Sequence, residues 1–339
     1  TLQAKDIPEE DRDYYLERRY PAFGNLVPRD VASRAAKERC DKGYGVNNTG
    51  LAVFLDFSEA INRLGKDVVA QRYGNLFDMY EEITDVSPYE NPMMIYPAIH
   101  YTMGGIWVDY ELMTSIKGLF AIGECNFSDH GANRLGASAL MQGLADGYFV
   151  LPYTIQNYLA DQITVPRFST DLPEFAAAEK AIQDKIDWMM NIKGKKSVDS
   201  IHKELGHVMW EYVGMGRTAE GLKEGLKRLK EIRKEFEKEL FIPGEKEGMN
   251  VELDKAIRLY DFITMGELVA YDALNRNESC GGHFREEYQT EEGEAKRDDE
   301  NYFYVACWEY QGSDEKEPVL LKEPLVYEAI KVQTRNYKS

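Results

Sequence analysis

Apolar positions in the later part of the chain recur at the spacing of amphipathic helices. Between Thr218 and Leu240 one apolar stripe runs through a background of Lys, Arg and Glu. The stripe consists of Leu222, Leu226, Leu229, Ile232, Phe236 and Leu240. Pro173 marks the first turn of an earlier helix, Ser197 is placed to cap the next one, and a fourth helix is predicted over residues 254–274. Three or four antiparallel helices with charged outer faces predict a small bundle.

The first part of the chain mixes shorter patterns. Residues 30–39 are rich in Ala and long side chains, which favours a helix. Residues 51–57 have the length and composition of a strand, and the chain from there to Arg72 is predicted to be helical with Ser58 as its N-cap. Near the other end, residues 303–308 predict an edge strand after a charged loop.

Glycine dominates the stretch between these regions. Residues 96–110 are predicted to be extended and rich in turns. Residues 116–123 alternate and end in glycine, which predicts a buried strand that leads into a turn. A helix of small and apolar residues is predicted over residues 138–160, with Gly143 and Gly147 on one side for close packing.

Composition narrows the classes of partner. The 339 residues are 43% hydrophobic, which is typical of a globular protein and allows two or three domains. Asp and Glu number 59 against 41 Lys and Arg, a formal net charge of −18 that disfavours nucleic-acid binding and polybasic membrane attachment. No window has the apolar length of a membrane span. The four scattered cysteines fit reduced thiols in a cytosolic compartment.

Three glycine-containing motifs carry the candidate ligand chemistry. They are His100-Tyr-Thr-Met-Gly104-Gly105, Gly118-Leu-Phe-Ala-Ile-Gly123-Glu124 and His130-Gly-Ala-Asn-Arg134-Leu-Gly136. Glycine lets the backbone approach a flat ligand, and the N–H groups at the start of the following helix, near Ala139 and Leu140, form an anion site. Glu124 is placed to accept hydrogen bonds from ribityl or ribose hydroxyls. The alternatives are that Glu124 lies in a solvated turn and that the glycines only form the turn between a strand and a helix.

One histidine and two arginines are candidates for holding anions or moving a proton. The planar fork of Arg134 can donate two parallel hydrogen bonds to a carboxylate, and its alternative role is a structural ion pair. His100 precedes a glycine pair and is otherwise a core histidine. Arg29 lies at a predicted helix start and is otherwise a surface arginine paired with an acid. His202 and His207 are five residues apart on one helix and make a poor metal pair.

These motifs together resemble those of the flavoprotein subunit of succinate dehydrogenase and fumarate reductase. The resemblance rests on the order and spacing of Pro28-Arg-Asp30, Pro97-Ala-Ile-His100-Tyr-Thr-Met-Gly-Gly105, Gly118 to Glu124, His130 to Gly136, and Glu278-Ser-Cys-Gly-Gly-His283-Phe-Arg285 with Arg297-Asp-Asp-Glu-Asn301. It spans essentially the whole chain, but only the later half of such a subunit. The chain opens on Thr1 in what reads as the interior of a domain, and the family's Gly-x-Gly-x-x-Gly loop and flavin-bearing histidine have no counterpart in it.

The resemblance implies an α/β (α+β) fold. Residues 1–95 would be part of the substrate-capping domain, and residues 96–165 would be the C-terminal segment of the FAD-binding domain. Residues 166–290 would form the helical bundle domain, and residues 291–339 a C-terminal segment.

The resemblance also implies a function with residues in named roles. The subunit would interconvert succinate and fumarate with FAD as cofactor. Arg29 would be the catalytic proton donor or acceptor, an unusual role because a guanidinium ordinarily keeps its proton. His100 and Arg134 would bind the dicarboxylate. Glu124 and the backbone at Ala139 and Leu140 would bind FAD.

The resemblance also implies partner subunits, which would attach this subunit to a membrane that it does not itself span. Electrons would pass to an iron–sulfur subunit and the quinone pool. A cytochrome b membrane anchor subunit would hold the complex on the cytoplasmic side of the cytoplasmic membrane.

Two alternatives stay open. L-Aspartate oxidase resembles the same motifs, although Arg297-Asp-Asp-Glu-Asn301 matches the respiratory subunit better. A non-catalytic fragment that lacks the FAD phosphate-binding half is the other. The chain also departs from the family at Ser279-Cys-Gly-Gly-His283, where Ser-Arg-Gly-Ala-His is usual, and at Ser138-Ala-Leu140, where Asn-Ser-Leu is usual. A backbone contact with the flavin survives the second change.

Overall fold

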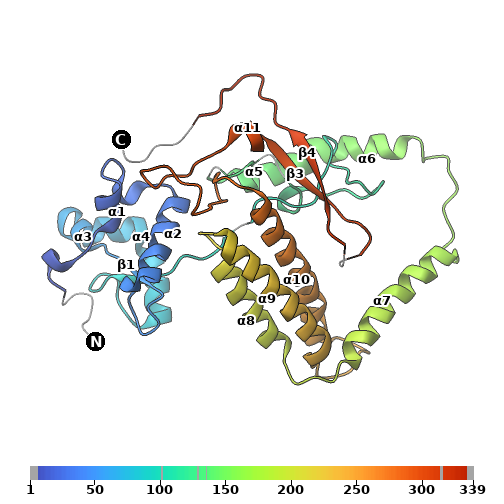
Figure 1. Cartoon of the computed structure of the whole chain (residues 1–339), viewed down its shortest axis with the longest axis horizontal. Coiled ribbons are helices and arrows are strands. Elements are labelled where there is room, and N and C mark those ends of the chain that lie inside the picture. The colour runs from blue at the N-terminus through green and yellow to red at the C-terminus, as the bar shows by residue number, and fades with distance from the viewer. Residues whose placement is uncertain (1–6, 101, 128–129, 135, 314–315, 334–339) are drawn as a thin grey trace. The chain divides into compact units, whose positions relative to one another are not determined.

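The computed structural model describes residues 7–100, 102–127, 130–134, 136–313 and 316–333 (Figure 1). The chain divides into two compact units. One comprises residues 1–101 and 332–339, and the other comprises residues 102–331. Tyr101 and Leu135, which belong to the motifs quoted above, lie outside the described residues.

The first unit combines helices of 5 to 19 residues with a pair of short strands. Its helices are α1 (Tyr15–Arg19), α2 (Arg29–Arg39), α3 (Ser58–Leu64) and α4 (Lys66–Thr84), and β1 (Val53–Leu55) pairs antiparallel with β2 (Met93–Ile95). Buried Val69 and Phe77 of α4 pack against Met93 of β2. The predicted helix over residues 30–39 is confirmed, and so is the strand predicted over residues 51–57, in its central three residues.

The helix predicted from Ser58 to Arg72 is in fact two helices. Gly65 separates them with a φ of +87°, a left-handed conformation that glycine adopts without steric cost. The prediction of Ser58 as N-cap is wrong, because Phe57 occupies that position. The Asp56 carboxylate accepts a hydrogen bond from the Ser58 N–H at 2.8 Å. An aspartate two residues earlier therefore supplies the acceptor for the first turn.

The second unit contains the helical bundle. Its helices are α7 (Pro173–Asn191), α8 (Val198–Tyr212), α9 (Ala219–Glu239) and α10 (Val251–Asn275), of which α8, α9 and α10 lie side by side (Figure 1). The predicted stripe of α9 faces their common core, with Leu226 at its edge. Ser197, Thr218 and Asn250 cap α8, α9 and α10, each accepting from the backbone N–H three residues later. The predicted bundle and the Ser197 cap are confirmed.

A helical segment runs from Ser138 to Ala160, as predicted, but a π-helical turn interrupts it. α5 (Ser138–Ala145) is followed by the π-turn Asp146–Val150 and by α6 (Leu151–Ala160). Gly143 does allow close packing, since a Cβ there would lie 3.5 Å from the Gly123 Cα. The same prediction for Gly147 is wrong, because no described residue comes within 4 Å of its Cβ position.

The buried strand predicted over residues 116–123 does not form. Phe120 makes one isolated bridge to Met113, and a 3-10 turn, η5 (Gly123–Cys125), ends the segment. Most of its apolar side chains are exposed, and Ala121 is buried. The alternation does describe extended backbone, but a strand also needs a neighbour to complete its hydrogen bonds. In the part of the chain that the structure describes, that neighbour is limited to residues 112–114, where the Thr114 N–H donates to the Leu119 carbonyl at 2.9 Å and the Ala121 N–H donates to the Leu112 carbonyl at 3.1 Å.

A hairpin completes the second unit. α11 (Asp299–Tyr302) leads into β3 (Tyr304–Glu309), which pairs antiparallel with β4 (Val319–Pro324). The edge strand predicted over residues 303–308 is confirmed, whereas its partner β4 was not predicted. The Trp308 indole N–H donates to Asp272 Oδ1 at 2.7 Å and attaches the hairpin to α10. None of the described helices has the length and hydropathy needed to cross a bilayer.

Candidate functional site

A buried carboxylate fixes the turn that carries Glu124. Asp146 Oδ2 accepts from the Gly123 N–H at 3.0 Å, from Asn126 Nδ2 at 3.3 Å and from Gln142 Nε2 at 2.9 Å. These bonds join η5 to α5 and the π-turn, while Glu124 itself is exposed. Its carboxylate is therefore presented to solvent from a rigid turn. Sequence reasoning missed this network, although two polar residues four apart in an apolar helix, Gln142 and Asp146, were a signal for it.

The start of α5 has no N-cap side-chain hydrogen bond. Ala137 precedes it with a φ of +62°, and this N-cap residue has no side-chain oxygen to satisfy the first N–H groups of the helix. Ala139 is buried, whereas 74% of the Leu140 surface is exposed. Of the two residues predicted to face a flavin, Ala139 is therefore packed against the protein, whereas the apolar side chain of Leu140 lies in solvent. An uncapped helix start attracts a negative charge.

Arg134 lies in the irregular loop that connects η5 to α5, and it is half-buried. A distant turn holds this loop, because the Gly282 N–H donates to the Ala132 carbonyl oxygen at 2.8 Å. Four of the six predicted site residues lie in the second unit, all of them on the segment from Glu124 to Leu140.

Arg29 and His100 belong to the first unit. Arg29 is the first residue of α2, and His100 follows β2 in an extended stretch; both side chains are exposed. The surface ion pair that was the alternative for Arg29 does not form with any described residue. The neighbouring Asp30 instead pairs with Arg34 at 3.4 Å. Both side chains are thus available to a ligand.

The C-terminal motif forms a buried polar cluster. The His283 imidazole lies between two partners: Nδ1 is 2.7 Å from Arg217 Nη1, and Nε2 is 2.9 Å from the Arg276 carbonyl oxygen. A guanidinium only donates, so Nδ1 accepts and Nε2 carries the proton. Burial lowers the pKa of Arg217 to about 10, which leaves it charged at neutral pH. Burial first, and then the charge of Arg217, lower the pKa of His283 to about 4.

We expect this histidine to make the fold less stable in mild acid. The unfolded chain protonates it near its ordinary pKa of 6.5. In the folded chain burial disfavours the charged imidazole, and the charges of Arg217, Arg276 and Arg285 add to this effect, so the pKa falls to about 4. Its contribution is therefore complete above pH 6.5 and declines as the pH falls towards 4, by about 1.4 kcal/mol per pH unit. Urea unfolding at pH 7 and pH 5 measures the loss.

The matched comparison uses His283→Gln and the exposed histidine variant His202→Gln. Between pH 7 and pH 5, wild type and His202→Gln should lose about 2 kcal/mol more than His283→Gln. Equal losses in all three proteins would contradict the assignment of a neutral, buried His283.

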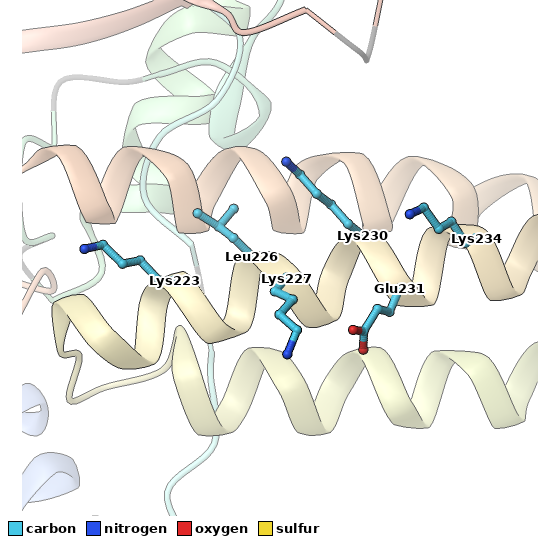
Figure 2. Close-up of a pocket in the computed structure, with 6 residues that line it drawn as sticks. All are labelled: Lys223, Leu226, Lys227, Lys230, Glu231 and Lys234. Atoms are coloured by element: carbon cyan, nitrogen blue, oxygen red, sulfur yellow. The ribbon is translucent and has the colours of Figure 1, made fainter.

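A second feature of the same unit lies on the outer face of α9. A hollow of about 370 Å³ is lined by Lys223, Leu226, Lys227, Lys230, Glu231 and Lys234 (Figure 2). All six side chains come from one helix, so the hollow lacks polar groups that converge from several elements. We assign it no chemistry.

Comparison with known proteins identifies the family. Residues 14–140 match the family model described as FAD binding domain, and residues 202–337 match the one described as fumarate reductase flavoprotein C-term. The succinate dehydrogenase flavoprotein subunit of Bacillus subtilis is 34% identical, over 81% of this chain and 46% of that protein. The fumarate reductase flavoprotein subunit of a Serratia strain is 32% identical, over 83% of this chain and 45% of that protein.

A solved structure agrees. A quinol-fumarate reductase with menaquinol molecules matches with a TM-score of 0.81 at 25% identity, over 96% of this chain and 56% of that chain. The chain belongs to the succinate dehydrogenase and fumarate reductase flavoprotein family. The family resemblance, the mixed α/β fold and FAD as the family's cofactor are thereby confirmed. The chain spans about half the length of the curated relatives it matches.

The described residues fit the part of FAD that this flavoprotein segment would contact. No described residue comes within 4 Å of the position that a Cβ would occupy on Gly104 or Gly136, so backbone is accessible there. Gln142 Oε1 is buried without a hydrogen-bond partner, which leaves an acceptor close to the Glu124 turn. Together with the uncapped start of α5, these features suit a flat, polar-edged and partly anionic ligand.

Proposed function

We propose that this chain is the substrate-binding, later part of an FAD-dependent oxidoreductase that interconverts succinate and fumarate. One observation carries the proposal: residues 124–140 combine a fixed, exposed Glu124, an uncapped helix start at Ala139 and Leu140, and the Arg134 guanidinium. A cofactor contact and a carboxylate contact thus lie on one segment of a flavoprotein family member.

The dicarboxylate contacts are assigned to His100 and Arg134. The Arg134 fork suits one carboxylate, since two parallel N–H groups match its two oxygens. The imidazole of His100 suits the other as a hydrogen-bond donor. Both residues lie in extended or irregular backbone a few residues before a glycine, where a ligand can approach closely.

The FAD contacts are assigned to Glu124, Ala139 and Leu140, and proton transfer to Arg29. Bound FAD would supply the hydride acceptor or donor for the C–C bond between the two carboxylates. Glu124 accepts hydrogen bonds from sugar hydroxyls, and the α5 amides stabilise negative charge on the ring. Arg29 moves the proton at the substrate carbon next to the one that exchanges the hydride.

We also propose that the electrons leave through an iron–sulfur subunit and a cytochrome b membrane anchor subunit to the quinone pool. The complex would lie on the cytoplasmic side of the cytoplasmic membrane. The likeness to a quinol-fumarate reductase supports a multi-subunit assembly. The formal charge of −18 favours contact with a protein partner over direct contact with anionic lipid.

Dye reduction by the FAD-loaded holoprotein tests the proposal. We expect succinate to drive the reduction of an artificial electron acceptor and to bleach the visible flavin band, and we expect L-aspartate to do neither. Activity with L-aspartate alone would favour L-aspartate oxidase. A colourless protein that takes up no FAD would favour a non-catalytic role.

A further inference from the structure

The turn Cys280–His283 reaches both motifs that carry a proposed substrate-binding residue, through backbone in one motif and through a side chain in the other. The Cys280 N–H donates to the His283 carbonyl at 2.8 Å, and the His283 N–H donates back to the Cys280 carbonyl at 3.0 Å, so the turn is closed on both sides. From its tip, the Gly282 N–H donates to the carbonyl of Ala132, two residues before Arg134. A Cβ on Gly282 would lie 3.0 Å from Met103 Cε, three residues after His100.

Gly281 makes this approach possible. Its φ is +58°, in the left-handed region, and a Cβ at this position would lie 2.2 Å from the Ala132 carbonyl oxygen and 2.9 Å from the Ala132 Cβ. An ordinary side chain would therefore both strain the turn and push the Ala132 backbone away. Because residues 130–134 form only turns, a bend and irregular backbone, they have no helix or strand of their own to resist such a push.

The other side of the turn is anchored in the bundle. His283 is held between the Arg217 guanidinium and the Arg276 carbonyl. Fully buried Ser279 accepts from the Arg285 N–H at 2.8 Å and donates to the Arg285 carbonyl at 3.0 Å. The connection between α8 and α9 and the end of α10 thus fix the turn, and the turn fixes the loop that carries Arg134.

We propose that His283 and Gly281 are positioning residues for dicarboxylate binding. His283 acts through the turn on the backbone at Ala132 and so sets where the Arg134 guanidinium meets a carboxylate. This inference rests on the proposed function, because it assumes that Arg134 binds the substrate. It predicts that damage to the turn weakens the binding of dicarboxylates more than it slows the chemistry.

Malonate binding to the FAD-loaded holoprotein, followed by the change in the flavin spectrum, tests the proposal with Gly281→Ala. We expect the Kd for malonate and the KM for succinate to rise by about 10- to 100-fold, while kcat changes by a few-fold at most. The matched control is Gly312→Ala, since Gly312 also has a positive φ, of +80°, but no described residue lies within 4 Å of its Cβ position. It should bind malonate like wild type.

A second pair of variants keeps the test decisive if Gly281→Ala does not fold. His283→Leu should weaken malonate binding, and His283→Asn should recover part of it, because an amide oxygen can accept from Arg217 as Nδ1 does. In parallel, backbone hydrogen exchange over residues 130–134 should be faster in Gly281→Ala and His283→Leu than in wild type. This readout does not depend on activity.

The outcomes separate the two proposals. Wild type that binds FAD but neither malonate nor succinate would overturn the proposed function. Wild type that binds malonate, with Gly281→Ala and His283→Leu binding it equally well or exchanging residues 130–134 at the wild-type rate, would overturn this inference alone.

Discussion

We expect Arg29→Lys to slow flavin reduction by succinate by about 10²–10⁴-fold, the range contributed by one well-placed acid or base. Lysine keeps the positive charge, so the attraction for a dicarboxylate changes little. Its ammonium is a compact point donor on a differently shaped stem and does not reproduce the position of the guanidinium N–H groups. The loss should therefore appear in kcat, with a small change in KM. Stopped-flow bleaching of the flavin band measures the rate.

Arg63→Lys is the matched control. Arg63 lies in the same unit, is exposed, and pairs with Glu59 at 2.8 Å on α3, so its replacement should leave the rate unchanged. Flavin content and thermal stability are measured for both variants as well. Both should match wild type, because Arg29 is exposed at the first position of α2 and contributes little to packing. A rate for Arg29→Lys within a few-fold of wild type would remove Arg29 from the proton-transfer step.

The helical bundle could be predicted from sequence because its determinants are local. The stripe from Leu222 to Leu240 fixes which face of α9 is buried, and Ser197 and Thr218 fix where two helices begin. Each signal lies within a few residues of the structure that it specifies. Pattern reasoning recovers such elements well.

The site was only partly predictable, because the residues that hold its loops in place are distant from those loops in sequence. Asp146 satisfies Gly123 across 23 positions, and Gly282 reaches Ala132 across a still longer separation. Neither contact leaves a periodic pattern. The open space at Gly136 and the close approach at Gly281 look alike in sequence, although one leaves room for a ligand and the other holds the backbone.

The strand predicted over residues 116–123 was wrong for a related reason. Alternation reports which side chains avoid water, but it does not reveal whether a neighbouring strand is present to complete the backbone hydrogen bonds. β4 illustrates the converse. Its residues are mostly exposed and lack alternation, yet pairing with β3 makes them a strand. Pairing is a property of two segments, so one segment's pattern cannot decide it.

We expect Arg285→Met to lower the free energy of unfolding by about 3 kcal/mol. Arg285 is 1% exposed, and its Nη1 donates to the carbonyls of Ala273 and Leu274 at 3.0 and 3.4 Å. These carbonyls lie in the last turn of α10, where no further helical N–H is available to them. Methionine fills much of the same space but donates nothing, so buried acceptors lose their partner at about 1–3 kcal/mol each. Urea unfolding at pH 7 measures the change.

The ion pair of Arg285 with Glu287 at 3.1 Å contributes less, because the Glu287 side chain is 39% exposed and water screens it. Arg285→Lys separates the two contributions: it keeps the charge near Glu287 but loses the guanidinium fork, and it should recover only a minor part of the stability. Arg258→Met is the control, since the Arg258–Asp254 pair on α10 is exposed on both sides and should contribute below about 0.5 kcal/mol. If Arg285→Met lowered the free energy of unfolding no more than Arg258→Met, the Arg285 side chain would not stabilise the end of α10. The Cys280–His283 turn would then be held by the hydrogen bonds of His283 and Ser279.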